Sequence, residues 1–244
     1  MKKRFVLGIT GGVGAGKSTV LQYLHKKYNA VLLQCDAIGM ELQQKGMPCY
    51  SPIVEAFGTD ILRADGQLNR EKLSKIVFSA PEALSRLNAI VHPAVKQEVR
   101  RRIETAEEEN RHDDIWENEE SGKTKEPCRN RDYQLYVIEA ALLLEDHYEE
   151  ICDQIWYIYA DPATRIQRLM RDRGYTEEKC RRIMAAQRDD VYYRSRCQEW
   201  IDNSTDLTQD TFDQLDAAIG RWYDRMIPEK GNKEEGKKAW TFVQ

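Results

Sequence analysis

The sequence predicts an α/β fold in which a doubly wound parallel sheet is flanked by helices, because short apolar runs alternate with helical patterns. Residues 5–9 (FVLGI) form an apolar run that glycines end, which is typical of a buried strand. Apolar residues then recur at helical spacing over residues 17–28, and residues 30–33 (AVLL) form a second apolar run. This strand–helix–strand order favours parallel pairing with helices on both faces of the sheet.

The rest of the chain continues this alternation. Further strands are predicted at residues 134–140 and 154–160. The further predicted helices are residues 69–78 with Asn69 as N-cap, residues 81 to about 110, a segment that begins at Asp161-Pro162, residues 176–194, and a last segment that carries Phe212, Leu215, Ile219 and Trp222 and ends before Pro228.

Composition excludes several classes of protein. No stretch approaches the roughly 18 apolar residues that are needed to cross a bilayer, and residues 1–10 lack the features of a signal peptide. The six cysteines are scattered without a CxxC pair, which indicates reduced thiols and a cytoplasmic protein. A net charge of −4 argues against a nucleic-acid partner. We expect a monomer or a weak homo-oligomer.

Residues 104–132 differ from the rest because they are strongly acidic and poor in apolar side chains. Eleven acidic and five basic residues give this segment a charge of −6, so the remainder of the chain carries +2. We expect a solvated insertion or the fraying extension of a helix. The predicted organisation is one domain over residues 1–228 followed by a polar tail over residues 229–244.

The strongest motif is the P-loop, residues 11–18 (GGVGAGKS), which fits G-x-x-x-x-G-K-[ST] between a predicted strand and a predicted helix. Its glycines let successive backbone N–H groups point at phosphate oxygens, and the helix that follows adds its positive dipole end. Lys17 can reach the β- and γ-phosphates, and the Ser18 hydroxyl can coordinate Mg²⁺. We therefore expect ATP to bind at Gly11, Gly12, Val13, Gly14, Ala15, Gly16, Lys17, Ser18 and Thr19.

The P-loop alone does not separate a kinase from a GTPase switch or an ATP-driven motor. Residues 36–39 (DAIG) match the D-x-x-G of GTPases but follow the P-loop too closely. Residues 232–235 (NKEE) lack the final Asp of a guanine-reading motif. The GTPase interpretation is therefore weak.

Asp36 stands directly after the second predicted strand, where ligands bind in doubly wound sheets. A carboxylate there could deprotonate the hydroxyl that accepts a phosphoryl group. The alternative is an Asp that only caps the next helix.

A group of arginines follows the fourth predicted strand and surrounds Gly174. Two helices joined by a glycine turn suit a lid over about residues 165–187, whose arginines would neutralise the transferring phosphoryl group. The alternative is a solvated surface, because Asp172, Glu177 and Glu178 lie among them. The basic residues are Arg165, Arg168, Arg171, Arg173, Arg181 and Arg182.

Nearly the whole chain resembles the dephospho-CoA kinase family, which has the P-loop nucleoside-monophosphate-kinase-like fold. The N-R-x-x-L motif, the H-P pair and the I-D-N motif are much more specific than the P-loop. The matching segments are residues 7–19 (LGITGGVGAGKST), 35–38 (CDAI), 57–62 (FGTDIL), 65–73 (DGQLNREKL), 76–78 (IVF), 87–93 (LNAIVHP), 139–145 (EAALLLE), 168–176 (RLMRDRGYT), 183–187 (IMAAQ) and 201–204 (IDNS).

The resemblance implies phosphorylation of the 3′-hydroxyl of dephospho-CoA by ATP, in a fold with a helical acceptor region and a small lid. Asp36 matches the general base, and Arg70 and His92 match the acceptor pocket. Arg168 and Arg173 match the lid, with Lys17 as the further catalytic residue. Asn203 lies where the chain passes the adenine of ATP.

One departure concerns the metal. The strand that ends at residue 139 usually presents Asp in this family, whereas here it presents Glu139. Glu139 could still hold Mg²⁺ through water, with Ser18 as the direct ligand. The alternatives to a dephospho-CoA kinase are a P-loop kinase with another small hydroxyl or nucleotide acceptor, and a non-catalytic ATP-binding switch.

Overall fold

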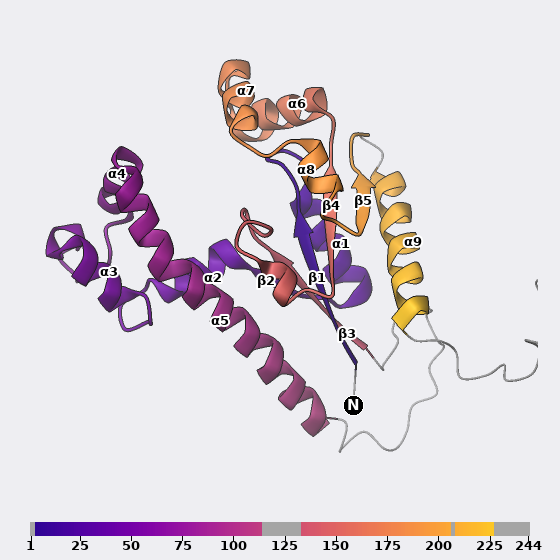
Figure 1. The fold of residues 1–244 in the computed structure, drawn as a ribbon, viewed down its shortest axis with the longest axis horizontal. Coiled ribbons are helices and arrows are strands. Elements are labelled where there is room, and N and C mark those ends of the chain that lie inside the picture. Colours follow the sequence, from indigo (N-terminus) through magenta and orange to yellow (C-terminus); the bar gives the residue numbers. More distant parts are fainter. Residues whose placement is uncertain (1–2, 114–132, 206–207, 227–244) are drawn as a thin grey trace, which may run out of the picture.

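A five-stranded parallel sheet forms the centre of the protein, in the order β2-β3-β1-β4-β5 (Figure 1). The computed structural model describes residues 3–113, 133–205 and 208–226. Each neighbouring pair of strands is parallel, which confirms the predicted fold class. The strands are β1 (Lys3–Thr10), β2 (Val31–Gln34), β3 (Tyr133–Glu139), β4 (Gln154–Tyr159) and β5 (Glu199–Asp202).

Helices cover both faces of this sheet, and several begin where the sequence places a cap. Asn69 Oδ1 accepts a hydrogen bond from Lys72 N, and Asp161 Oδ1 accepts one from Thr164 N. The helices are α1 (Lys17–Tyr28), α2 (Cys35–Leu42), α3 (Tyr50–Phe57), α4 (Arg70–Ser79), α5 (Pro81–Asp113), α6 (Pro162–Arg173), α7 (Glu177–Ala185), α8 (Asp190–Arg194) and α9 (Thr208–Met226), with short 3₁₀ turns η1 (Thr59–Ile61) and η2 (Tyr148–Glu150).

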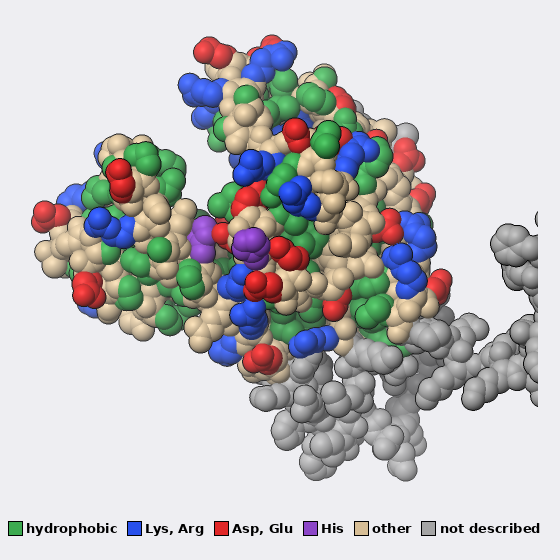
Figure 2. Space-filling model, in the orientation of Figure 1, with side chains coloured by type: hydrophobic (Ala, Val, Ile, Leu, Met, Phe, Trp, Pro, Cys, Tyr) green, Lys and Arg blue, Asp and Glu red, His purple; other side chains and the backbone are tan. Residues whose placement is uncertain are grey.

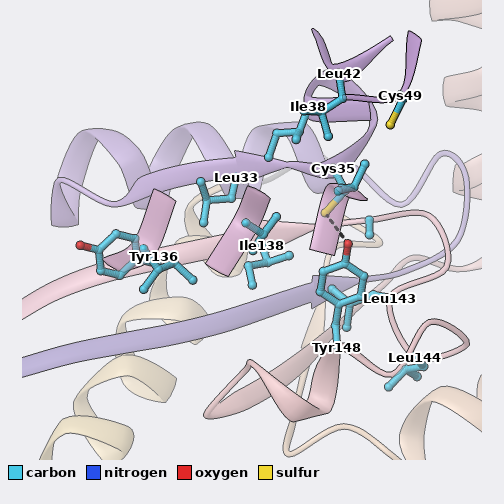
Figure 3. Close-up of a cluster of buried hydrophobic side chains, with 14 of the residues drawn as sticks. Leu33, Cys35, Ile38, Leu42, Cys49, Tyr136, Ile138, Leu143, Leu144 and Tyr148 are labelled. Carbon is cyan, nitrogen blue, oxygen red and sulfur yellow. Dashed lines mark hydrogen bonds between the residues drawn. The ribbon is translucent and has the colours of Figure 1, made fainter. Parts of the chain in front are cut away.

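The core consists of two clusters, one on each face of the sheet, because successive strand side chains point to opposite faces. On β1, Phe5, Leu7 and Ile9 pack with α1 and α9, whereas Val6 packs on the other face. That other face also holds α2, α5 and the turn after β3. Figure 3 draws part of this second cluster.

Two parts of the chain project from the sheet. In Figure 1, α3, α4 and the start of α5 form one projection, and α6 with α7 forms the other. The surface between them is hollowed in the view of Figure 2. None of the helices in the described part of the chain has the length and apolar character to span a bilayer.

The predicted single helix over residues 176–194 is wrong, because the chain forms α7 and α8 with a break between them. The break has one tertiary and one local cause. The Gln187 side chain accepts hydrogen bonds from Val13 N and Arg165 Nη2, at 3.1 and 2.6 Å. Asp189 then caps α8 by accepting from Tyr192 N at 2.8 Å.

The other predicted elements are confirmed with small shifts at their ends, while α2, α3 and β5 were not predicted. Within the acidic segment, residues 104–113 continue α5, so the helix extension is the correct alternative there. Residues 114–132 and the predicted tail lie outside the described residues.

Candidate active site

The carboxyl ends of the parallel strands lie at one edge of the sheet and bring the predicted residues together. The P-loop follows β1, Asp36 follows β2, Glu139 ends β3 and Asn203 follows β5. A cavity of about 810 Å³ lies at this edge and is called the P-loop cavity below. Its lining includes all nine predicted ATP-binding residues of Gly11–Thr19 together with Asp36, Glu139, Arg168, Arg171, Arg173, Gln187 and Asn203.

The P-loop is held in close contact with the strands beneath it. A Cβ atom on Gly11 would lie 2.4 Å from the Ile158 carbonyl oxygen, so only glycine fits at this φ of 153°. Gly16 has φ 84° and precedes the first residue of α1. The Asn203 side chain donates to the Ala15 carbonyl at 2.7 Å and ties β5 to the loop.

Lys17 lies at the centre of the charged groups in this cavity. Its Nζ atom donates to the Gly11 carbonyl at 2.9 Å and lies 4.0 Å from Glu139 Oε1. Burial lowers the pKa of Lys17, the nearby positive charges of Arg165 and Arg173 lower it further, and Glu139 partly opposes this. Several positive groups are therefore concentrated beside the P-loop, which favours a polyanionic ligand.

Glu139 and Ser18 offer oxygen atoms in the same cavity. Burial raises the pKa of Glu139, while Lys17 lowers it and Asp36 raises it. Carboxylate and hydroxyl oxygens are ligands that Mg²⁺ accepts, so the residues present fit this ion. Within the described ranges, no group of three or more His, Cys, Asp or Glu side chains could hold a metal alone. Phosphate and water would therefore supply the remaining ligands.

A second cavity, of about 320 Å³, lies between α2, α5 and the turn after β3 and is called the α2–α5 cavity below. Asp36 and Ala141 line both cavities, so the two are adjacent. α2 begins at Cys35 after Gln34, so Asp36 lies in the first turn and is not the N-cap residue. The α2–α5 cavity is lined by Cys35, Asp36, Gly39, Met40, Gln43, Val91, His92, Val95, Ala140, Ala141, Leu142, Asp146 and Tyr148.

A buried contact closes one wall of the α2–α5 cavity. Cys35 Sγ donates to the Tyr148 hydroxyl at 3.3 Å, as the dashed line in Figure 3 shows. Burial raises the pKa of Cys35 to about 11 and also raises the pKa of Tyr148, so neither group is ionised at neutral pH. Neither residue was predicted as part of a site.

The predicted lid arginines have different surroundings. Arg165 donates from Nε to the Val13 carbonyl at 2.8 Å and holds Gln187, so it supports the P-loop. Arg168 donates from Nη2 to the Thr205 carbonyl at 3.3 Å, whereas its buried Nη1 has no hydrogen-bond partner among the described residues. A buried donor of this kind in the wall of a cavity suits an anionic ligand. Arg173 also lines the P-loop cavity.

Arg70 and His92 lie apart from the P-loop cavity. His92 lines the α2–α5 cavity, and its Nδ1 lies 2.9 Å from Asp146 Oδ2. Arg70 lines neither cavity, and its Nη2 donates to the Met40 carbonyl at 3.1 Å. Asp146 was missed because no local pattern marks a carboxylate that meets a histidine 54 residues earlier in the chain.

The chain matches known proteins over nearly its full length. The sequence pattern of the dephospho-CoA kinase family matches residues 5–113 and 121–209. Dephospho-CoA kinase from Bacillus thuringiensis subsp. konkukian is 32% identical over 217 residues, which cover 89% of this chain and 96% of that protein. The enzyme of this name from Enterococcus faecalis is 31% identical over 225 residues, with 92% and 98% covered.

Solved structures share the fold. A crystal structure from Thermus thermophilus has a TM-score of 0.66 and 24% identity, and covers 90% of this chain and 98% of that chain. Dephospho-CoA kinase from Campylobacter jejuni has a TM-score of 0.61 and 16% identity, with 91% and 100% covered. At these sequence identities the two structures show the fold alone. The family is shown by the sequence matches.

Proposed function

The chain belongs to the dephospho-CoA kinase family, and we propose that it transfers the γ-phosphoryl group of ATP to the 3′-hydroxyl of dephospho-CoA, which gives CoA and ADP. The observation that carries this proposal is the position of Asp36 in the common wall of two cavities. A transfer between two bound nucleotides requires two adjacent sites with a proton acceptor where they meet.

ATP occupies the P-loop cavity in this proposal. The backbone N–H groups of the P-loop bind its phosphates, and the Lys17 ammonium group donates hydrogen bonds to the β- and γ-phosphates. Asn203 donates a hydrogen bond to the Ala15 carbonyl of the P-loop, and the family resemblance places the adenine of ATP beside it. The free Nη1 donor of Arg168 and the guanidinium of Arg173 stabilise the negative charge on the transferring group.

Dephospho-CoA occupies the α2–α5 cavity, with its 3′-hydroxyl at Asp36. Asp36 accepts the hydroxyl proton as the oxygen attacks the γ-phosphorus, and the bond to the β-phosphate oxygen of ADP breaks. His92 contacts the bound acceptor from α5. Arg70 acts on the acceptor site from outside the cavity, through its bond to the Met40 carbonyl in α2.

Ser18 and Glu139 would hold Mg²⁺, Ser18 directly and Glu139 through water. When bound, the ion neutralises charge on the β- and γ-phosphates. Glu139 also lies near Lys17 and so helps to keep the lysine charged against the effect of burial.

The test is to incubate the protein with Mg-ATP and dephospho-CoA and to detect CoA and ADP by mass spectrometry. Asp36→Asn should lower turnover by about 10²–10⁴-fold, the contribution of a general base, while ATP binding changes little. Asp60→Asn is the matched control, because Asp60 is exposed and lines neither cavity. Turnover of the Asp36 variant within a few-fold of wild type would remove Asp36 from this role.

The same assay separates the other candidate functions. A panel of small hydroxyl and nucleotide acceptors should give a phosphorylated product only with dephospho-CoA. Another product would indicate a kinase with a different acceptor. Slow ATP hydrolysis without any phosphorylated product would indicate a non-catalytic switch.

The organisation and cellular context of the chain stay predictions. We propose a single domain over residues 1–228 with a lid over about residues 165–187, a monomer or weak homo-oligomer, and a cytoplasmic location without a nucleic-acid partner. Analytical ultracentrifugation and cell fractionation would test these statements.

A further inference from the structure

His92 and Asp146 form a pair in the wall of the α2–α5 cavity, and Asp146 has no role in the reaction described above. His92 Nδ1 lies 3.0 Å from Asp146 Oδ1 and 2.9 Å from Oδ2. Both side chains line the cavity and are only partly exposed, at 33% and 26%. The pair joins α5 to the turn after β3, two segments that are distant in the sequence.

The contact with Asp146 orients the histidine ring, because a carboxylate accepts a hydrogen bond from Nδ1. In the neutral form of the ring, this contact places the proton on Nδ1, where it points at Asp146. Nε2 is then left as a hydrogen-bond acceptor for a ligand in the cavity. Without the carboxylate, the ring could rotate and exchange its tautomer, and this acceptor would no longer be fixed in place.

The turn that carries Asp146 is firmly attached to the core. Asp146 N donates to the Leu142 carbonyl at 2.8 Å, and Tyr148 N donates to the Leu143 carbonyl at 3.0 Å. The side chains of Leu143 and Leu144 are buried. On the other side of the pair, Val95 follows His92 by about one turn of α5, and its side chain is buried. The two partners are therefore held by the scaffold, independently of each other.

We propose that Asp146 is a positioning residue for dephospho-CoA: it holds the imidazole of His92 so that Nε2 accepts a hydrogen bond from the acceptor bound in the α2–α5 cavity. This proposal rests on the proposed function. It assigns Asp146 to the binding of one substrate, because the carboxylate lies outside the lining of the P-loop cavity.

The first experiment measures steady-state kinetics for Asp146→Asn with each substrate varied in turn. The KM for dephospho-CoA should rise about tenfold, the size expected for a lost oriented hydrogen bond, while the KM for ATP stays within about twofold. Thermal unfolding of the same samples verifies that the variant is folded. Asp146→Glu is the second variant, and it should give an intermediate KM because it keeps the carboxylate.

The chain offers a matched control three residues away. His147 Nδ1 lies 3.0 Å from Glu149 Oε1, but both side chains are more than half exposed and line neither cavity. Glu149→Gln removes a comparable histidine–carboxylate pair outside the site. The KM values of this variant should equal those of wild type.

A double-mutant cycle tests whether Asp146 acts through His92. The KM of His92→Ala combined with Asp146→Asn should equal that of His92→Ala alone, because a positioning residue has no effect once its partner is absent. Additive effects, an unchanged acceptor KM in Asp146→Asn, or equal increases in both KM values would each overturn the proposal. If wild type makes no CoA, the proposed function fails first, and this proposal fails with it.

Discussion

The two cavities differ in what forms their walls. The P-loop cavity has at its centre one continuous segment, Gly11–Thr19, whose backbone lies against β4, with side chains of other elements around it. The α2–α5 cavity is formed by side chains from three segments, residues 35–43, 91–95 and 140–148. The first depends on a chain conformation that glycine alone permits, whereas the second depends on which side chains meet across the fold.

This difference separates two ways of recognising a nucleotide. Backbone N–H groups recognise phosphates, which all nucleoside triphosphates share, so the P-loop cavity gives affinity with little selectivity. Side chains such as His92 and Asp146 can match one acceptor and exclude others. Substitutions should therefore have different consequences in the two cavities.

The largest effect is expected for Gly11→Ala in the P-loop cavity. The added Cβ would lie 2.4 Å from the backbone oxygen of Ile158 in β4, which cannot move without distorting the sheet. We expect a loss of about 3 kcal/mol or more in the free energy of unfolding, together with loss of ATP binding. Urea denaturation and nucleotide titration would measure both.

Gly220→Ala serves as the control for this substitution. Gly220 is exposed within α9, and none of the residues that the structure describes has an atom within 4 Å of the added one, apart from the helix itself. This variant should be more stable than wild type by about 0.5–1 kcal/mol. A Gly11→Ala protein with normal stability and normal ATP affinity would refute the view that the backbone defines this cavity.

A smaller effect is expected where α1, the helix that follows the P-loop, is attached to α9. Asp216 accepts hydrogen bonds from Lys27, from Tyr28 at 2.6 Å and from Tyr23 at 2.7 Å. Burial raises the pKa of Asp216, but these bonds outweigh it and leave the pKa lowered. Because the group is partly exposed, Asp216→Asn should cost only about 1 kcal/mol at pH 7.

The pH dependence of this cost follows from the lowered pKa. A carboxyl group whose pKa is lowered in the folded state stabilises that state at pH values above its pKa in the unfolded chain, which is about 3.9. The contribution is lost as the pH falls through the lowered value. Urea unfolding of both proteins from pH 7 to pH 3 should show the difference shrink at the acid end, with both KM values unchanged at pH 7. A constant difference would contradict this account.

The smallest effect, of opposite sign, is expected for Gly39→Ala in the α2–α5 cavity. The added Cβ would meet Val95 and Val91 at 3.4 and 3.5 Å, which is ordinary contact. α2 should gain about 0.5–1 kcal/mol from the better helix former, and the acceptor KM should stay within about twofold. Strong destabilisation of this variant would mean that the α2–α5 cavity also requires glycine for a close backbone contact. The same substitution thus separates the two cavities.

The contrast also explains how far sequence reasoning reached. The P-loop is recognisable because its eight residues are contiguous and their spacing carries the mechanism. Four of the five strands and most helices are predicted by apolar runs, by helical periodicity and by caps such as Asn69 and Asp161. The placement of Asp36 at the sheet edge followed from its position directly after a strand.

Features that depend on tertiary contacts could not be predicted in this way. The break after α7 depends on Gln187 reaching Val13, which is 174 positions earlier. Strand β5 (Glu199–Asp202) lacks the apolar run that marks β2, which is equally short, because polar residues stand at both of its ends. The partnership of His92 and Asp146, and the bond of Arg70 to Met40, arise only when α2, α5 and the turn after β3 pack together.

The common wall at Asp36 has a consequence for inhibition. A single ligand that joins two nucleoside groups through a phosphate chain could enter both cavities at once. Once one half is bound, the other half binds at an effective concentration that the linker sets, without any new contact. Affinity should therefore depend sharply on the number of bridging phosphates, because a chain too short to pass Asp36 would leave one half outside.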